Sequence, residues 1–119
     1  GLVLTRGCQP VRRALLDFWQ ADAEGAYDNR GFRLRGHQFT DGEGRYRLRT
    51  MVPARYPGRT PHIHVKEQAA NHPALTTQLY FPGEPGNARD SLFRSELQMR
   101  IAGGGERRSG QFDFVLDMA

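Results

Sequence analysis

The stretch Arg59-Thr60-Pro61-His62-Ile63-His64 reads as the entry to a β-strand that carries two histidines. Pro61 fixes its own backbone dihedral and pushes Thr60 towards extended geometry, as the start of a strand requires. Side chains two residues apart in a strand point to the same face, so His62 and His64 are expected to converge. Two converging imidazoles indicate a metal site. The alternative is one buried and one solvated histidine, and only further ligands elsewhere in the chain distinguish the two.

Similar short segments lie on both sides of this stretch and are separated by glycine and proline turns. Alternation of apolar and polar residues, or a short apolar run, predicts strands at residues 2–5, 14–19, 32–35, 45–51, 62–64, 75–81 and 112–116. The only helical pattern lies near residues 90–101, and the glycines at 103–105 are expected to end it. Short strands at regular spacing predict an all-β fold, namely a β-sandwich with one short helix.

The bulk composition is that of a soluble globular domain. A chain of 119 residues is large enough to bury a single core without disulfides, and its hydrophobic fraction of 38% is ordinary. No apolar run approaches the roughly 20 residues that span a bilayer, so a membrane protein is not expected. Because the chain opens at Gly1 without a methionine, its localisation stays open between cytoplasmic and exported after loss of a leader. The single cysteine, Cys8, excludes neither compartment.

The charge pattern gives little support to nucleic-acid binding. The net charge of +4 comes from 17 basic and 13 acidic residues, and the arginines are scattered along predicted strands. Arginines that share one face of a strand are more often solvated than gathered into a phosphate-binding surface. A mild positive field is still expected to draw an anionic small molecule towards a cleft.

Three stretches together resemble the intradiol ring-cleavage dioxygenases, the family of catechol and protocatechuate dioxygenases. They are residues 19–27, from Trp19 to Tyr27; residues 40–46, a glycine turn; and residues 53–64, which hold Tyr56 and both histidines. Residues 75–81 and 87–90 are also similar, so the likeness runs from about residue 2 to residue 95. The resemblance implies the prealbumin-like β-sandwich of that family, with residues 1–119 as a single catalytic core.

The resemblance implies a non-haem ferric site. In the family, two tyrosines and two histidines hold Fe(III), and the matching positions here are Tyr27, Tyr56, His62 and His64. A hard ferric ion favours anionic oxygen and can deprotonate a phenol, whose pKa is ordinarily about 10, at neutral pH. By analogy with the family, Tyr56 and His62 are axial ligands, and Tyr27 and His64 are equatorial.

The implied reaction is cleavage of a catechol-type aromatic by O2 to a cis,cis-muconate-type diacid. Tyr56 is expected to leave the metal when substrate binds and to take a substrate proton as base. Arg59, three residues before the first histidine, is expected to stabilise negative charge that develops on the ring, with assistance from Gln78. The implied partners are therefore a small catechol-type substrate and O2.

Two other interpretations stay open at this point. Residues 41–46 and 53–56 also resemble transthyretin-like and carboxypeptidase-regulatory sandwiches, which are non-enzymatic binding modules without iron and need neither Tyr27 nor the two histidines. A cupin-like metal site would require a downstream glutamate and another histidine, and His72 is not well spaced for that role. His37 and His72 are expected to be solvated in polar loops, and Trp19 is expected in the core.

Departures from the family bear on the substrate. The helical dimerisation segment of the catechol branch is missing from the sequence, and the loop at residues 28–36 is shorter than its counterpart in the protocatechuate branch. Both regions help to shape the substrate pocket in the family. The ring substituent is therefore not predicted, and homo-oligomerisation stays open.

Overall fold

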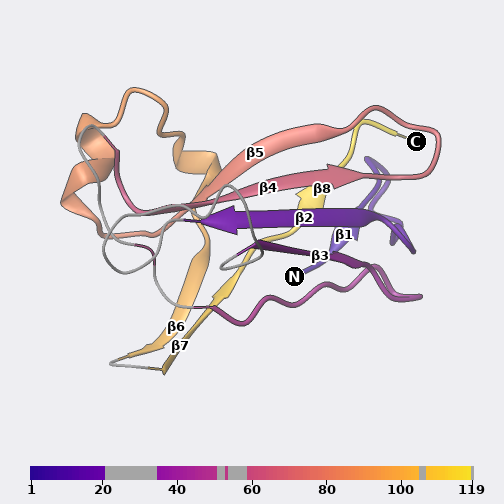
Figure 1. The fold of residues 1–119 in the computed structure, drawn as a ribbon, viewed down its shortest axis with the longest axis horizontal. Helices are drawn as coiled ribbons and strands as arrows, with labels where there is room; N and C mark the ends of the chain where they lie inside the picture. The colour runs from indigo at the N-terminus through magenta and orange to yellow at the C-terminus, as the bar shows by residue number, and fades with distance from the viewer. Residues whose placement is uncertain (21–34, 51–52, 54–58, 105–106, 119) are drawn as a thin grey trace.

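The computed structural model describes residues 1–20, 35–50, 53, 59–104 and 107–118, and these consist mainly of β-strands and loops (Figure 1). The strands are β1 (Val3–Leu4), β2 (Leu15–Gln20), β3 (Arg35–Phe39), β4 (His62–Gln68), β5 (Leu75–Tyr80), β6 (Arg100–Gly104), β7 (Arg107–Gln111) and β8 (Phe114–Val115). Two short 3-10 helices, η1 (Pro85–Arg89) and η2 (Ser95–Leu97), lie between β5 and β6. Among the described residues, no helix is long and apolar enough to cross a bilayer. The predicted all-β class is confirmed.

A four-stranded antiparallel sheet with the order β3-β2-β4-β5 forms the centre of the fold. β2 and β4 are its inner strands, and their register runs from Leu15 opposite Gln68 to Gln20 opposite Ile63. On its other edge β4 pairs with β5, so its backbone is hydrogen-bonded on both sides. This double pairing fixes which residues lie opposite one another and which face each side chain takes.

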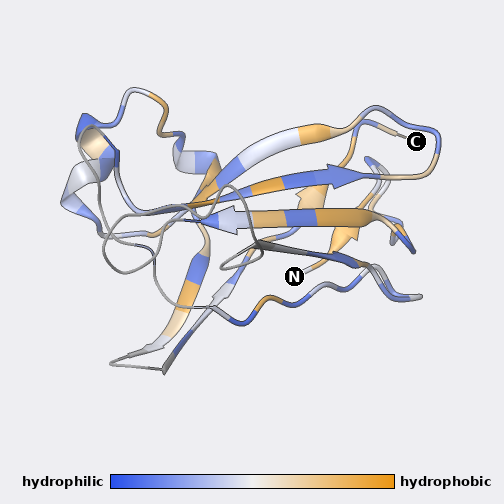
Figure 2. Cartoon of the chain, viewed as in Figure 1, coloured by the Kyte–Doolittle hydropathy of each residue, from blue (hydrophilic) through white to orange (hydrophobic). Residues whose placement is uncertain are grey.

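One face of this sheet builds the hydrophobic core. Leu16 and Phe18 of β2 are buried there together with Val65 of β4, while the residues that alternate with Leu16 and Phe18 are half-buried. The parallel pair of β1 and β8 adds Val3 and Phe114 to the same core cluster. Figure 2 shows apolar residues gathered on β2, β1 and β8. Each fully buried side chain of this kind contributes about 1.5–3 kcal/mol, so these layers supply the main stabilisation of the fold.

The glycine turn expected at residues 40–46 is confirmed. The carboxylate of Asp41 accepts hydrogen bonds from the backbone N–H groups of Glu43 and Arg45, both at 2.9 Å. Gly44 has a positive φ of 76°, and a Cβ at this position would lie 2.8 Å from the carbonyl oxygen of Val3. Only glycine combines this backbone conformation with such a close approach, so the turn depends on Gly44.

The helix predicted near residues 90–101 is wrong. In this region the structure has only the single turn η2, and Arg100–Gly104 forms β6, which pairs with β7. The backbone N–H of Met99 donates to the carbonyl of Tyr80 at 2.9 Å, and Gln98 forms a β-bridge with Tyr80. Pairing with the end of β5 therefore holds this segment extended and outweighs its helical spacing of apolar residues.

The strand predicted at residues 45–51 is also wrong over its described part. Residues 45–50 make only an isolated bridge between Arg45 and Leu2. The side chain of Gln38 binds the backbone of Arg47 instead: its Oε1 accepts from the Arg47 N–H at 2.9 Å, and its Nε2 donates to the Arg47 carbonyl. A side chain thus takes the place of a strand-to-strand ladder, which alternation alone does not reveal.

The remaining strand predictions divide into three groups. The strands expected at residues 2–5, 14–19, 62–64, 75–81 and 112–116 are present within a few residues as β1, β2, β4, β5 and β8. The strand expected at 32–35 falls almost wholly outside the described residues, and β3 instead occupies Arg35–Phe39. β7 was not predicted, because its polar sequence, Arg-Arg-Ser-Gly-Gln, lacks a strand pattern.

Glu67 is an unusual core residue. It lies on β4 with none of its surface exposed, opposite Leu16 on one side and Leu75 on the other. Within the described part of the chain, neither oxygen of its carboxyl group has a hydrogen-bond partner. Burial raises the pKa of Glu67 to about 8, because the ionised form would lose its hydration. The folded state therefore favours the neutral carboxylic acid.

We predict that Glu67 makes the protein less stable as the pH rises. Because its pKa is raised from 4.5 to about 8, the folded state holds a proton that the unfolded state releases between these values. The free energy of unfolding then falls by up to about 1.4 kcal/mol per pH unit over this range. Urea denaturation of wild type and Glu67→Gln at about pH 5 and about pH 8 gives the free energy of unfolding of each protein at each pH. The contribution of Glu67 is the difference between the two proteins in the change of this free energy with pH.

Glu96→Gln, which removes a surface carboxylate, is the matched control and should retain the wild-type pH slope. Glu67→Leu should be more stable than wild type at the upper pH, because it removes the buried polar group and keeps an apolar side chain of similar size. An unchanged slope in Glu67→Gln would contradict the assignment.

Candidate functional site

The register of the central sheet gathers the candidate site on the face opposite the core. Trp19 of β2 lies opposite His64 of β4, and His64 lies opposite Gln78 of β5. Directly opposed residues of an antiparallel pair share a face, so these three side chains form a row across three strands. Two residues before His64, on the same face of β4, His62 lies opposite Tyr80 of β5. The sheet therefore brings together three of the candidate site residues, His62, His64 and Gln78.

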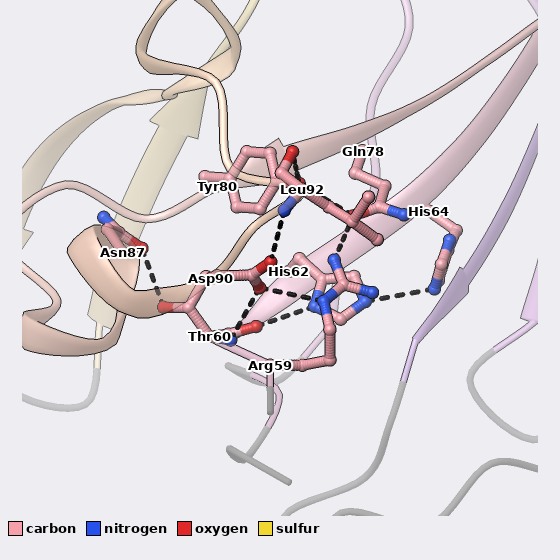
Figure 3. Close-up of polar contacts among 9 residues, drawn as sticks. All are labelled: Arg59, Thr60, His62, His64, Gln78, Tyr80, Asn87, Asp90 and Leu92. Carbon is pink, nitrogen blue, oxygen red and sulfur yellow. Dashed lines mark hydrogen bonds and ion pairs between the residues drawn. The ribbon is translucent and has the colours of Figure 1, made fainter. Parts of the chain in front are cut away.

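The histidine pair, His62 and His64, presents two ring nitrogens to each other. The Nε2 atoms are 3.1 Å apart, and the rings meet nearly edge to face (Figure 3). Nδ1 of His62 lies 2.7 Å from the carbonyl oxygen of Thr60, which can only accept, so Nδ1 carries the proton. In the neutral ring, Nε2 of His62 then holds the lone pair.

Both histidines are held in the neutral form. Burial lowers the pKa of His62, and the positive charge of Arg59 lowers it further against opposing contributions from Thr60 and Asp90. Burial also lowers the pKa of His64 to about 4, with additional contributions from His62 and Arg59. Neutral imidazole, in which one ring nitrogen is unprotonated, is the state that binds metal ions.

The spacing of the histidine pair fits a shared metal ion. Two nitrogens bound at about 2.1 Å from one ion and at right angles lie about 3.0 Å apart, close to the 3.1 Å between the two Nε2 atoms. The hydrogen bond from Nδ1 of His62 to Thr60 is the kind of contact that orients a ligating histidine. Within the described part of the chain, no group of three or more His, Cys, Asp or Glu residues forms a metal site, so further ligands would be of another type or lie elsewhere.

Trp19 forms a wall of the site rather than part of the core. Its ring stacks on His64 with a centroid distance of 5.0 Å and parallel planes, and its side chain is only half-buried. The prediction that Trp19 packs in the core is therefore wrong. The indole shields one face of His64 from water, which contributes to the lowered pKa of that histidine.

Arg59 enters the site from the segment that precedes β4. Its Nε donates to Oδ2 of Asp90 at 2.8 Å, and its Nη2 donates to Oε1 of Gln78 (Figure 3). The same Oε1 lies 2.8 Å from the hydroxyl of Tyr80, which is also 2.9 Å from the carbonyl of Leu92. Arg59 and Gln78 are thus joined directly, and their catalytic roles stay predictions.

The sequence did not indicate every residue that builds this site. Thr60, Tyr80, Asn87 and Asp90 hold the predicted residues in place, and the sequence assigned none of them to the site. The signal available was the similarity of residues 87–90 to the family, which carried no chemistry by itself. Tyr27 and Tyr56 lie outside the described residues, and their roles as ligands stay predictions.

The other two histidines lie apart from the pair. His37 is exposed on β3 rather than in the expected loop, and His72 is half-buried in the loop before β5, where its Nδ1 lies 2.8 Å from the carbonyl of Ala70. In the described residues neither joins the histidine pair in a larger cluster of acidic, histidine or cysteine side chains. The cupin-like alternative therefore receives no support.

A cavity of about 1030 Å³ lies on the other face of the central sheet. Its lining includes Ile63 and Leu79, the neighbours of His64 and Gln78 along their strands. Successive side chains of a strand point to opposite faces, so this cavity faces away from the histidine pair. It is not part of the candidate site.

Comparisons with known proteins identify similar chains. A family model described as Dioxygenase matches residues 1–118. The protocatechuate 3,4-dioxygenase beta chain of Burkholderia cepacia is 38% identical over 112 residues, which cover 79% of this chain and 48% of that protein. A hydroxyquinol 1,2-dioxygenase of a Rhizobium species is 32% identical over 117 residues, covering 78% of this chain and 40% of the relative. The chain thus spans about half or less of the length of these relatives.

Solved structures share the fold. The dioxygenase domain of a dioxygenase carbohydrate-binding protein fusion from Streptomyces sp. SirexAA-E is 60% identical with a TM-score of 0.96, covering 100% of this chain and 77% of that one. The 3-chlorocatechol 1,2-dioxygenase of Rhodococcus opacus is 30% identical with a TM-score of 0.87, and the match covers 100% of this chain and 58% of that chain. The predicted β-sandwich of this type is confirmed. The transthyretin-like binding module is not favoured, because these relatives are dioxygenases.

We predict that a metal ion bound to the histidine pair quenches the fluorescence of Trp19. Trp19 is the only tryptophan of the chain and stacks directly on His64, so a paramagnetic ion held by that ring would lie close to the indole. Titration of metal-free protein with Cu²⁺ should quench the emission strongly and saturably. His64→Ala should abolish the saturable phase, and His72→Ala, the control, should retain it. Equal quenching in all three proteins would rule out binding at the pair.

Proposed function

This chain belongs to the intradiol ring-cleavage dioxygenase family, and on that premise we propose that it cleaves a catechol-type aromatic between its two hydroxyl-bearing carbons with O2. The product is a cis,cis-muconate-type diacid. The observation that carries the proposal is the convergence of two neutral histidines next to a fixed arginine. We further propose that residues 1–119 contribute one catalytic core.

The proposed cofactor is non-haem Fe(III), held by Tyr27, Tyr56, His62 and His64. The histidine pair supports this ligand set through the distance between its Nε2 atoms and the lowered pKa of each ring. The two tyrosines come from the family resemblance and supply the anionic oxygen that a hard ion favours. When bound, ferric iron would supply a Lewis-acidic centre that binds the deprotonated catechol and activates its ring towards O2.

Protein side chains carry the remaining steps. Tyr56 is proposed to accept a proton from a substrate hydroxyl as general base. Arg59 keeps its positive charge at any working pH and is held beside the histidine pair by Asp90 and Gln78. A fixed cation at this place stabilises negative charge on the ring as it develops, because the side chain has no need to reorganise during the reaction.

The substrate is proposed at the level of its class. The relatives named above act on protocatechuate, hydroxyquinol and 3-chlorocatechol, and all three names denote catechol-type aromatics. The chain carries a net charge of +4, which favours the approach of anionic aromatics. Oxygen uptake with catechol, protocatechuate, hydroxyquinol and 3-chlorocatechol, followed by identification of the diacid, selects among them.

We predict that the iron-loaded protein is red-brown, because phenolate oxygens on ferric iron give a charge-transfer band in the visible. Tyr27→Phe and His64→Ala should each lose most of this absorbance and the oxygen uptake. His72→Ala, which changes a histidine outside the site, should keep both. Absorption spectra, bound-iron content and oxygen uptake of the four proteins are the measurements.

The outcomes separate the parts of the proposal. A protein that stays colourless and iron-free after reconstitution would contradict the ferric site and the reaction together. A coloured protein with full absorbance in Tyr27→Phe would contradict the assignment of that tyrosine alone. Iron binding without oxygen uptake on any catechol would contradict the proposed reaction.

A further inference from the structure

We propose that Asp90 is a positioning residue of the candidate site, whose carboxylate fixes both the guanidinium of Arg59 and the backbone N–H of Thr60, the residue whose carbonyl orients His62. The inference rests on the proposed function, because it assigns Arg59 and His62 to that reaction. The side chain of Asp90 is only 1% exposed, and both of its carboxylate oxygens accept hydrogen bonds.

The three donors to Asp90 come from two different parts of the chain. Oδ2 accepts from Nε of Arg59 at 2.8 Å and from the backbone N–H of Thr60 at 3.0 Å. Oδ1 accepts from the backbone N–H of Leu92 at 2.9 Å, which anchors the carboxylate to its own loop. Burial pushes the pKa of Asp90 upward, but these hydrogen bonds outweigh it and hold the pKa below its ordinary value. The group is therefore an ionised, fully bonded carboxylate at neutral pH.

One branch of contacts runs from Asp90 to the proposed catalytic arginine. Asp90 binds Nε, so the guanidinium plane is fixed and Nη2 reaches Oε1 of Gln78 (Figure 3). Tyr80 approaches the same oxygen at 2.8 Å. An arginine held at two of its nitrogens is already restricted to one rotamer before substrate binds. Substrate binding then costs no further side-chain entropy at this residue.

A second branch runs from Asp90 to the histidine pair. Asp90 holds the N–H of Thr60, and the hydroxyl of Thr60 donates to Oδ1 of Asn87 at 2.7 Å. The carbonyl of Thr60 accepts from Nδ1 of His62 at 2.7 Å. The residue whose carbonyl sets the tautomer and orientation of the ring is thus held by Asp90 and Asn87, and only 1% of its surface is exposed. Such partners of a ligating histidine affect metal affinity or activity by about 10- to 100-fold.

The 3-10 helix η1 and the residue after it bring both groups to Thr60. Asn87 lies in η1, and Asp90 follows the helix directly, with its backbone N–H donating to the carbonyl of Asn87 at 3.3 Å. Asn87 is itself fixed by donating from Nδ2 to the carbonyl of Phe81 at 2.9 Å. The loop between β5 and β6 therefore acts as a template that sets the geometry of the strand entry in front of β4.

The test compares wild type with Asp90→Asn, which keeps the side-chain size and removes the charge. The matched control is Glu96→Gln, which also removes a carboxylate that faces an arginine, here Arg94 at 4.0 Å on the surface. The first readout uses iron-free protein: nitrogen NMR reports the tautomer of His62 and the solvent exchange of the Arg59 Nε–H. The second uses iron-loaded protein and measures kcat and KM with the best catechol substrate.

Wild type and Glu96→Gln should show the Nδ1–H tautomer of His62 and slow exchange at Arg59. Asp90→Asn should show mixed tautomers and fast exchange. The kcat of Asp90→Asn should fall about 10- to 100-fold with little change in KM. The reason is that a misplaced Arg59 stabilises the charge that develops during the reaction less well, whereas substrate binding is unaffected. A role in folding alone would lower the melting temperature and leave the tautomer and the exchange rate of the folded protein unchanged.

Each outcome decides the proposal. A folded Asp90→Asn protein that keeps both NMR signatures overturns the positioning role. If this variant does not fold, the NMR measurements on wild type test the proposal. Slow exchange of the Arg59 Nε–H together with the Nδ1–H tautomer of His62 supports it. Fast exchange, or the Nε2–H tautomer, overturns it. If wild type cleaves no catechol, the proposed function fails, while the NMR readouts still test Asp90 separately.

Discussion

The antiparallel pairing of β4 with both β2 and β5 is the constraint on which the rest of the structure depends. With both edges paired, alternation along β4 sends Ile63 and Val65 to the core and His64 to the opposite face. A slip of one residue would place His64 among the apolar side chains and lose the core together with the site. The stability of the sheet and the position of the candidate ligands are therefore set by the same hydrogen bonds.

Strand pairing alone does not fix a functional site, because side chains on a strand keep their own torsional freedom. Here that freedom is removed by loop residues: η1 and the residue after it supply Asn87 and Asp90, which hold Thr60 and Arg59. A buried polar network with every member satisfied is rigid, because any departure leaves a donor or acceptor without a partner. The loop after β5 thus holds Arg59 and the strand entry before the histidine pair in place.

The sequence was informative where local pattern and tertiary structure agree. A short apolar run located β2, the proline before the two histidines located β4, and a segment rich in strand-forming residues located β5. The resemblance supplied Arg59, His62, His64 and Gln78 as candidate site residues, and their roles stay predictions. The pattern failed at residues 90–101, where pairing with Tyr80 holds an apparent amphipathic helix extended. Asp90 could not be recognised as important, because its role arises from contacts with residues about 30 positions away, which no local pattern records.

Glu67 and Asp90, the two buried carboxyl groups among the described residues, show what separates a hydrogen-bonded carboxylate from an unpartnered one. Glu67 lies on the core face without a partner in the described part of the chain, and burial raises its pKa to about 8. Asp90 is buried too, but one charged and two neutral donors keep its pKa below the ordinary value. Burial favours the neutral form in both, so the difference lies entirely in the donors. A carboxylate that orients a cation at neutral pH must belong to the second kind, because a neutral acid would leave the guanidinium of Arg59 unpaired at the point where its direction matters.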